Sequence, residues 1–400
     1  MKSMRKTLIA LLSGLVLGGC QAAPQHKAMH LNDHGGPTPV ATGAEMTPAA
    51  FDPSGCSAVD LQTMPQLTAI MPTLAKRRVV FVGETHDQYA HHLMQLEIIK
   101  RLHALHPDLA VGMEYFQQPF QKYLDDYIAG RIDEKEMLRR TEYFKRWRYD
   151  YRLYRPILTY ARENGIHLVA LNVRSELSRK VAQGGLKSLS PEERKSVPVE
   201  FDQSDKAYRQ RLKTIFERHP DPRGHKFDYF VQAQLLWDEG MAQRAADYLK
   251  ANPGRHMVIL AGSGHIMYGS GIPQRLERRT ALPMATVING VQESITPDLA
   301  NFLLLPPELQ LPPAGKLGVL LDEGGGAVRI QDFENGSPAR KAGLENGDTV
   351  LSLGGEPVKS MADVRIAMLG KKPGDTIQVK VRRNRLFVAH EVETFSVKLH

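Results

Sequence analysis

Short apolar runs alternate with segments of helical periodicity through the middle of the chain. Apolar side chains recur at helical spacing in two stripes: Met94, Ile98, Leu102 and Leu105, and then Phe230, Ala233, Trp237, Met241, Ala245 and Tyr248. Five runs are almost continuously apolar: residues 78–82, 109–113, 167–171, 257–261 and 285–288. Runs of this kind are typical of parallel strands buried on both faces of a sheet. The alternation predicts an α/β domain over residues 57–305, with a mainly parallel sheet flanked by helices.

Two connections in this domain, residues 115–157 and 188–230, are too long for simple crossovers. We expect them to form a helical cap. The two apolar stripes are interpreted as the core-facing sides of helices, because spacing of this kind arises from burial far more often than from cofactor binding.

The pattern changes after a joint that contains Pro306-Pro307 and Pro312-Pro313. Residues 314–398 predict a small β-rich domain. Its strands are expected at 318–321, 327–330, 349–353 and 376–381, the last of these being the final strand. Helices are expected to begin at Ser337-Pro338-Ala339 and to span residues 361–369.

The chain begins with the order of segments found in a secretion signal. Lys2, Arg5 and Lys6 precede an apolar run from Leu8 to Leu17, and small residues then lead to Cys20. The apolar run is too short for a membrane span of about 20 residues. Residues 1–19 are therefore interpreted as a signal peptide, and the small residues before Cys20 resemble a lipobox. That resemblance implies acylation of Cys20 and a membrane anchor, and Gln21 after it favours the outer membrane.

Cysteine and charge limit the remaining possibilities. With Cys20 acylated, only Cys56 remains, so an intramolecular disulfide is not possible and stability must come from the cores. The formal net charge of +8 falls by three with the signal cations, and the excess forms no block of like charge. We therefore expect no nucleic-acid partner.

Residues 20–56 have the composition of a flexible tether, because they contain little apolar periodicity. His26, His30 and His34 recur every four residues within it. Histidine-rich tracts can bind metal or haem, but a solvated linker with chance histidines is the simpler interpretation.

Polar residues follow each predicted strand of the α/β domain. Glu84 and His86 follow the first, Glu114 the second and His265 the fourth, while the third and fifth end in Asn172 and Asn289. Because ligands bind at the carboxyl ends of parallel strands, we expect Glu84, His86, Glu114 and His265 to converge. They could hold a transition metal such as Zn or Fe, or act as general acid and base, or merely cap the following helices.

The loop after the fourth strand adds Tyr268, one turn from His265 if the segment is helical. Tyrosinate is a known type of haem-iron ligand, and a nearby histidine can tune it; the alternative is an ordinary half-buried tyrosine. Residues 143–149 join aromatic and cationic side chains that could stack on a flat macrocycle and pair with its propionates. An amphipathic cap helix explains the same segment equally well.

Four short motifs in this order resemble the ChaN family of haem-binding lipoproteins, within the Tiki and erythromycin-esterase-like superfamily. They are Val82-Gly83-Glu84-Thr85-His86, Gly112-Met113-Glu114, Trp237-Asp238 and Ala261-Gly262-Ser263-Gly264-His265 with Tyr268-Gly269 and Gly271-Ile272-Pro273 after it. The resemblance implies an α/β fold and a dimer that holds paired, cofacial haems. It makes Tyr268 the candidate ligand of the haem iron, supported by His265 and by His86, Glu84 and Glu114.

The same superfamily includes metalloproteases and other hydrolases. They resemble this chain at Glu84, His86, Glu114 and His265, so a metal-dependent hydrolase with Zn or another divalent metal is the main alternative.

Residues 314–398 resemble a bacterial PDZ domain through Gly336-Ser337-Pro338-Ala339, Ala342-Gly343-Leu344 and Gly347-Asp348. Leu317, Gly318, Val319 and Leu320 stand where the carboxylate-binding loop and its strand are expected. The resemblance implies that the C-terminal peptide of an envelope protein adds to this strand, with its last side chain beside Val364 and Met368. A spacer or dimerisation module that binds no peptide is the alternative.

The sequence thus predicts a non-catalytic haem receptor for haem or iron uptake, anchored in the outer membrane, whose PDZ domain recruits a partner. In a third hypothesis the protein is an interaction protein: the PDZ domain carries its function and the α/β domain is a scaffold.

Overall fold

The computed structural model describes residues 61–62, 64–218, 224, 226–290, 295–383 and 391–400. Cys20, Cys56 and the tether histidines His26, His30 and His34 lie outside these ranges, as does the signal segment. Within the described ranges, no helix combines the length and the apolar character needed to cross a membrane.

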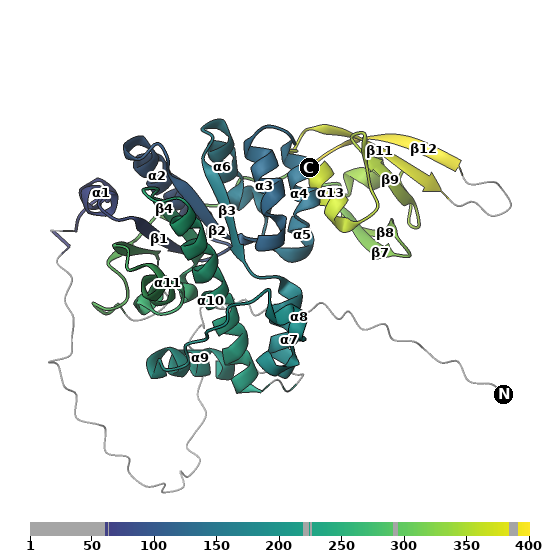
Figure 1. The fold of residues 1–400 in the computed structure, drawn as a ribbon. Helices are drawn as coiled ribbons and strands as arrows, with labels where there is room; N and C mark the ends of the chain where they lie inside the picture. Colours follow the sequence, from purple (N-terminus) through teal and green to yellow (C-terminus); the bar gives the residue numbers. More distant parts are fainter. Residues whose placement is uncertain (1–60, 63, 219–223, 225, 291–294, 384–390) are drawn as a thin grey trace, which may run out of the picture. The chain divides into compact units, whose positions relative to one another are not determined.

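A six-stranded sheet forms the centre of the α/β domain, and every neighbouring pair of its strands is parallel (Figure 1). The strand order is β3-β2-β4-β1-β5-β6. The strands are β1 (Val79–Glu84), β2 (Ala110–Gln117), β3 (His167–Asn172), β4 (Met257–Gly262), β5 (Met284–Asn289) and β6 (Phe302–Leu304). The predicted fold class is confirmed. The sequence pattern missed β6, because it is three residues long and only half-buried.

Alternate residues of β1 pack into two different cores, as a strand buried on both faces requires. Val80 and Val82 belong to the core under α1 (Leu67–Ala75), α2 (Tyr89–Leu105) and α6 (Tyr151–Glu163). Val79 and Phe81 belong to the opposite core, which α10 (Phe227–Ala251) and α11 (Ile272–Thr280) cover. The apolar stripes predicted on α2 and α10 are thus core faces, except that Leu105, the last residue of α2, is 58% exposed.

The two long connections are helical, as predicted. Residues 115–157 contain η2 (Gln118–Phe120), α3 (Gln121–Ile128), α4 (Glu134–Arg140), α5 (Tyr143–Arg146) and the start of α6. Residues 188–230 contain α8 (Pro191–Arg194), α9 (Lys206–Arg218) and the start of α10; α7 (Ser175–Gly184) and η3 (Leu186–Ser188) come between β3 and this segment. The stretch from β3 to α10 has a small apolar core of its own, where Val173 and Val181 pack against Ala233 and Leu236 of α10. This separate core holds α7 beside α10.

The C-terminal domain is an antiparallel sheet with two short helices. Its elements are β7 (Val319–Gly324), β8 (Ala327–Phe333), α12 (Pro338–Lys341), β9 (Thr349–Leu353), β10 (Glu356–Pro357), α13 (Met361–Ala367), β11 (Thr376–Arg383) and β12 (Glu391–Lys398). The strand order β12-β11-β9-β8-β7 leaves β7 at an edge. The prediction that residues 376–381 form the final strand is wrong, because β12 follows β11. It missed β12 because only Val397 of that strand is fully buried.

Candidate functional site

Glu84, Glu114 and His265 meet at the carboxyl edge of three adjacent strands, as predicted. Glu84 ends β1, Glu114 lies in the second half of β2, and His265 follows β4, which lies between these two strands. Glu84 and Glu114 are only 2% and 5% exposed. Carboxylates at such depth require hydrogen bonds or counter-charges, and the neighbouring groups supply both.

Glu84 and His86 form a buried ion pair. Oε1 of Glu84 lies 2.6 Å from Nδ1 of His86. Burial disfavours the charged imidazole, but the charge and hydrogen bond of Glu84 and the charge of Glu114 outweigh it, and the pKa of His86 rises to about 9. Burial acts against the Glu84 carboxylate as well, yet the charges of His86 and His92 leave its pKa below the usual value.

Asp238 and His265 form a second pair of the same kind. Asp238 lies on α10 with no exposed surface, and its Oδ1 lies 2.6 Å from Nδ1 of His265. Nε2 of His265 points to the other side, 3.5 Å from Oε1 of Glu114. Burial opposes protonation here too, but Asp238 and Glu114 outweigh it and raise the pKa of His265 to about 9. The charge of Glu114 therefore raises the pKa of both histidines.

Gly262 makes this close approach possible. Its N–H donates to Oε2 of Glu114 at 2.8 Å. A Cβ atom at Gly262 would lie 2.8 Å from Cε1 and 3.2 Å from Nε2 of His86. Any larger residue at this position would force the imidazole away from Glu114.

Aromatic side chains line one side of His86. The ring centroids of Trp147 and Tyr149 lie 5.0 Å and 4.7 Å from that of His86. Tyr154 donates from its hydroxyl to the carbonyl oxygen of His86 at 3.1 Å. The aromatic segment singled out in the sequence thus contacts the site through Trp147 and Tyr149, whereas Tyr143 is buried in the core.

The side chains of Asn172 and Asn289 donate hydrogen bonds to the backbone at this edge of the sheet. Nδ2 of Asn172 donates to the carbonyl oxygen of Glu114 at 3.0 Å, and Nδ2 of Asn289 donates to that of Gly83 at 2.9 Å. Each side chain ties its own strand to the neighbouring one. The two asparagines therefore fix the backbone that carries the two glutamates.

Among the residues that the structure describes, no cluster of three or more His, Cys, Asp or Glu side chains has the geometry of a metal site. Nδ1 of each histidine lies in a short hydrogen bond to a carboxylate, which fixes the orientation of the imidazole ring. Histidine–carboxylate pairs of this kind can hold and release protons.

Tyr268 is separated from His265 by a break in the helix. Ser263–His265 and Met267–Gly269 form two 3-10 turns, η4 and η5, and Tyr268 itself has left-handed backbone angles (φ 62°, ψ 17°). The suggested single helical turn joining His265 and Tyr268 is therefore wrong. The physical reason is that the Tyr268 N–H donates to the carbonyl oxygen of Leu299 at 2.8 Å rather than to a residue of the preceding turn.

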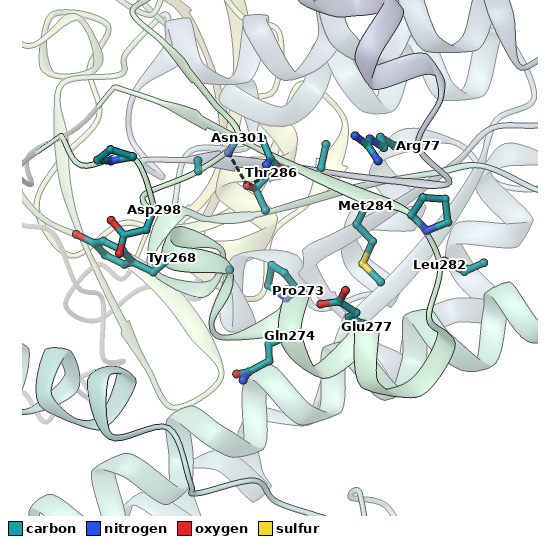
Figure 2. A pocket seen from close by; sticks show the side chains of 15 residues that line it. Arg77, Tyr268, Pro273, Gln274, Glu277, Leu282, Met284, Thr286, Asp298 and Asn301 are labelled. Carbon is teal, nitrogen blue, oxygen red and sulfur yellow. Dashed lines mark hydrogen bonds between the residues drawn. The ribbon is translucent and has the colours of Figure 1, made fainter. Parts of the chain in front are cut away.

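Tyr268 lines a cavity of about 440 Å³ beside β5 and α11. Figure 2 shows Tyr268 and Asp298 at one end of the cavity and Glu277 and Leu282 at the other. None of Glu84, His86, Glu114 and His265 is among the residues that line it. The candidate residues thus occupy two places, a histidine–carboxylate site and a tyrosine cavity.

Helix α9 contacts both the histidine–carboxylate site and the tyrosine cavity. Tyr208 of α9 donates from its hydroxyl to Oδ2 of Asp238 at 2.5 Å. One turn later, the guanidinium of Arg211 lies over the ring of Tyr268, 4.4 Å from its centroid, and donates to the hydroxyl of Ser270. The sequence analysis assigned no role to Asp238, Tyr208 or Arg211. Only the motif Trp237-Asp238 offered a signal, since the two α9 residues lie about 30 and 60 positions from their partners.

The proposed peptide-binding loop is well anchored. The carbonyl oxygen of Leu317 accepts the N–H of Ala339 at 3.1 Å, next to the first turn of α12. Gly318 has a φ of +69°, and a Cβ atom there would lie 3.0 Å from Pro338. Val319 and Leu320 begin β7, the edge strand of its sheet.

Comparison with known proteins gives two family matches. Residues 70–276 match the family described as "Haem-binding uptake, Tiki superfamily, ChaN", and residues 315–399 match the PDZ domain. A solved structure, "Cofacial heme binding to ChaN of Campylobacter jejuni", superposes with a TM-score of 0.50 at 17% identity, over 61% of this chain and 92% of that one. At this identity the superposition shows a shared fold.

Two curated relatives match stretches of different length. Protein RETICULATA-RELATED 5, chloroplastic, of Arabidopsis thaliana is 28% identical over 231 residues, which cover 52% of this chain and 30% of the relative. A probable periplasmic serine endoprotease DegP-like of Rhizobium meliloti is 41% identical over 64 residues, 16% of this chain and 12% of the relative. The chain thus spans less than a third of the length of either relative. Because the first family model covers half of the chain and the second its C-terminal sheet, this protein belongs to the ChaN haem-binding family of the Tiki superfamily and carries a PDZ domain.

Proposed function

We propose that the α/β domain binds haem and that Tyr268 is the ligand of the haem iron. The observation that carries the assignment to Tyr268 is its left-handed backbone on a cavity wall. Such angles cost a residue other than glycine about 1–3 kcal/mol. They persist only where the surrounding structure fixes the backbone, and they are concentrated at active sites and ligand sites.

The chemistry of Tyr268 fits a haem ligand. Its side chain is half-buried, and its hydroxyl makes no hydrogen bond to any residue that the structure describes. A phenolate oxygen is one of the protein ligands that haem iron accepts, and when bound the haem would supply the iron chemistry. Arg211 above the ring carries the positive charge that a phenolate or a propionate requires nearby.

We further propose a role in haem or iron uptake and a dimeric assembly. The protein would take part in haem or iron uptake as a dimer holding paired haems, since the related structure from Campylobacter jejuni is described by cofacial haem binding. It would be anchored through acylated Cys20 in the outer membrane, and its PDZ domain would bind the C-terminus of an envelope protein. Palmitate labelling of the intact chain and its loss in Cys20→Ser tests the anchor.

A haemin titration of residues 21–400, followed by absorbance, tests haem binding. We expect saturable binding with a tyrosinate-type spectrum, and loss of that spectrum in Tyr268→Phe. Tyr123→Phe is the matched control, because Tyr123 is also half-buried with an arginine, Arg140, over its ring. Failure of the unaltered protein to bind haemin overturns the proposal; equal spectra for all three proteins overturn the choice of Tyr268.

A second candidate function is hydrolysis at the histidine–carboxylate site. Its support is the pair of partly buried imidazoles, each hydrogen-bonded to a carboxylate at 2.6 Å, with Glu114 acting on the pKa of both. Groups that hold and release protons at such positions can act as general acid and base. Glu84, His86, Glu114 and His265 would carry the reaction.

The hydrolysis of p-nitrophenyl acetate, with and without EDTA, tests this candidate. Activity that falls at least tenfold in His265→Asn and His86→Asn supports it, and sensitivity to EDTA together with bound Zn or Mn by elemental analysis identifies the metal-dependent form. His103→Asn is the control, since His103 bonds to Tyr160 outside the site. Absence of activity in the unaltered protein contradicts it.

A further inference from the structure

The edge strand β7 changes character along its length. Its first half is apolar, with Val319 and Leu321 packed against the domain core and Leu320 exposed. Its second half presents two exposed carboxylates, Asp322 and Glu323. An edge strand with unpaired backbone groups accepts a further strand, so an added peptide would run past both halves.

The apolar half of β7 belongs to the same apolar cluster as α13. Met361 and Val364 of α13 and Met368, which follows its last residue, recur at helical spacing and belong to the same apolar cluster as Val319 and Leu321. Val319, Leu321, Met361 and Met368 are only partly buried, which leaves apolar surface for a ligand side chain. Lys316 is exposed immediately before the loop at this end of β7.

The acidic half of β7 lies where α13 begins. Oε2 of Glu323 accepts the N–H of Met361, the first residue of α13, at 2.9 Å. Among the described residues, neither Asp322 nor Glu323 takes part in an ion pair, although Arg329 stands opposite Asp322 on β8. The two carboxylates therefore lie exposed in the second half of β7, next to the start of α13.

The change from apolar to acidic residues along β7 matches one kind of peptide. In an antiparallel pair each peptide residue stands opposite one residue of β7, so a C-terminal residue near Val319 places the residues three to five positions upstream beside Asp322 and Glu323. We propose that this PDZ domain selects C-termini with an apolar last residue and basic residues at those upstream positions. The inference rests on the peptide-binding function proposed above and deepens it.

The test compares two labelled decapeptides by fluorescence anisotropy with residues 21–400. Both end in the same three apolar residues with a free carboxylate; one carries two lysines and the other two glutamates at the upstream positions. We expect the lysine peptide to bind about five- to tenfold more tightly at low salt, with the difference shrinking as salt is added. The doubly substituted variant D322K/E323K should reverse the preference.

The variant D332N/E334Q is the matched control, because it removes two carboxylates near the other end of β7, where the N–H of Glu334 donates to the carbonyl oxygen of Gly318. It should keep the preference for lysine. Equal affinity of the two peptides, or a preference that D322K/E323K leaves unchanged, overturns the charge rule while leaving peptide binding intact. Failure of both peptides, and of their amidated forms, to bind overturns the peptide-binding function and the charge rule together.

Discussion

Nδ1 of His265, on the turn after β4, lies 2.6 Å from Oδ1 of Asp238, which has no exposed surface on α10. This contact joins two residues that are 27 positions apart in the chain. It orients the imidazole so that Nε2 faces Glu114 at 3.5 Å. A buried carboxylate behind a histidine both fixes its ring and favours its charged form, so the properties of His265 depend on α10.

Asp238→Asn should lower the pKa of His265 from about 9 toward the usual range. The substitution removes the Asp238 charge, which offsets the effect of burial on the charged imidazole. Loss of one partner of a buried pair should also reduce the free energy of unfolding by about 3–5 kcal/mol. The measurement is an NMR titration of the histidine Cε1–H signals. Asp247→Asn on the exposed face of the same helix is the control, and a His265 signal that still titrates near 9 would contradict the relationship.

The free energy of unfolding should fall between about pH 6.5 and pH 9. The pKa values of His86 and His265 are raised from 6.5 to about 9, so the folded state binds these protons more tightly than the unfolded chain. Their contribution is complete below the unfolded value and is lost as the pH rises through the folded one. Lowered pKa values at His91, His167 and His256 act below pH 6.5, outside this window.

Urea unfolding at intervals across that window measures the effect. The variants His86→Asn and His265→Asn should each show a weaker pH dependence than the unaltered protein. The prediction is contradicted if the free energy of unfolding stays constant or rises from pH 6.5 to pH 9.

Gly262→Ala should displace His86, since the new Cβ would lie 2.8 Å from its Cε1. We expect a loss of about 1–3 kcal/mol in the free energy of unfolding and a lower pKa of His86. Gly264→Ala is the control, because a Cβ there meets nothing within 4 Å. The prediction is checked by chemical denaturation and by the NMR titration of His86; equal behaviour of the two variants would count against the close contact.

Gln121→Ala should weaken the edge of the parallel sheet. Nε2 of Gln121 donates to the carbonyl oxygen of Leu168 at 2.7 Å, and its Oε1 accepts the N–H of Ala170 at 2.8 Å, so the side chain replaces the missing neighbour of β3. Without the Gln121 side chain, the unpaired carbonyl oxygen of Leu168 and N–H of Ala170 should lower the free energy of unfolding by about 1–3 kcal/mol. Hydrogen exchange at Ala170 should become faster, whereas Gln210→Ala on the exposed face of α9 should leave it unchanged.

The local pattern determined the parallel sheet, its two flanking cores and the C-terminal sheet. The five predicted strands are present because a strand buried on both faces must be apolar at every position, and that signal is visible in a window of six residues. It failed for β6 and β12, since a short half-buried strand and a strand with one fully buried residue carry no such signal.

The convergence of Glu84, His86, Glu114 and His265 also followed from the sequence, because parallel strands bring their carboxyl ends to one edge whatever their order. The partners of these residues did not. Asp238 comes from the middle of a helix whose orientation depends on packing against the sheet, and Tyr208 and Arg211 come from a helix held by α10. The separation of Tyr268 from the histidines depended on a backbone reversal at Tyr268 that a bond to Leu299 holds, and only the tertiary structure supplies that partner.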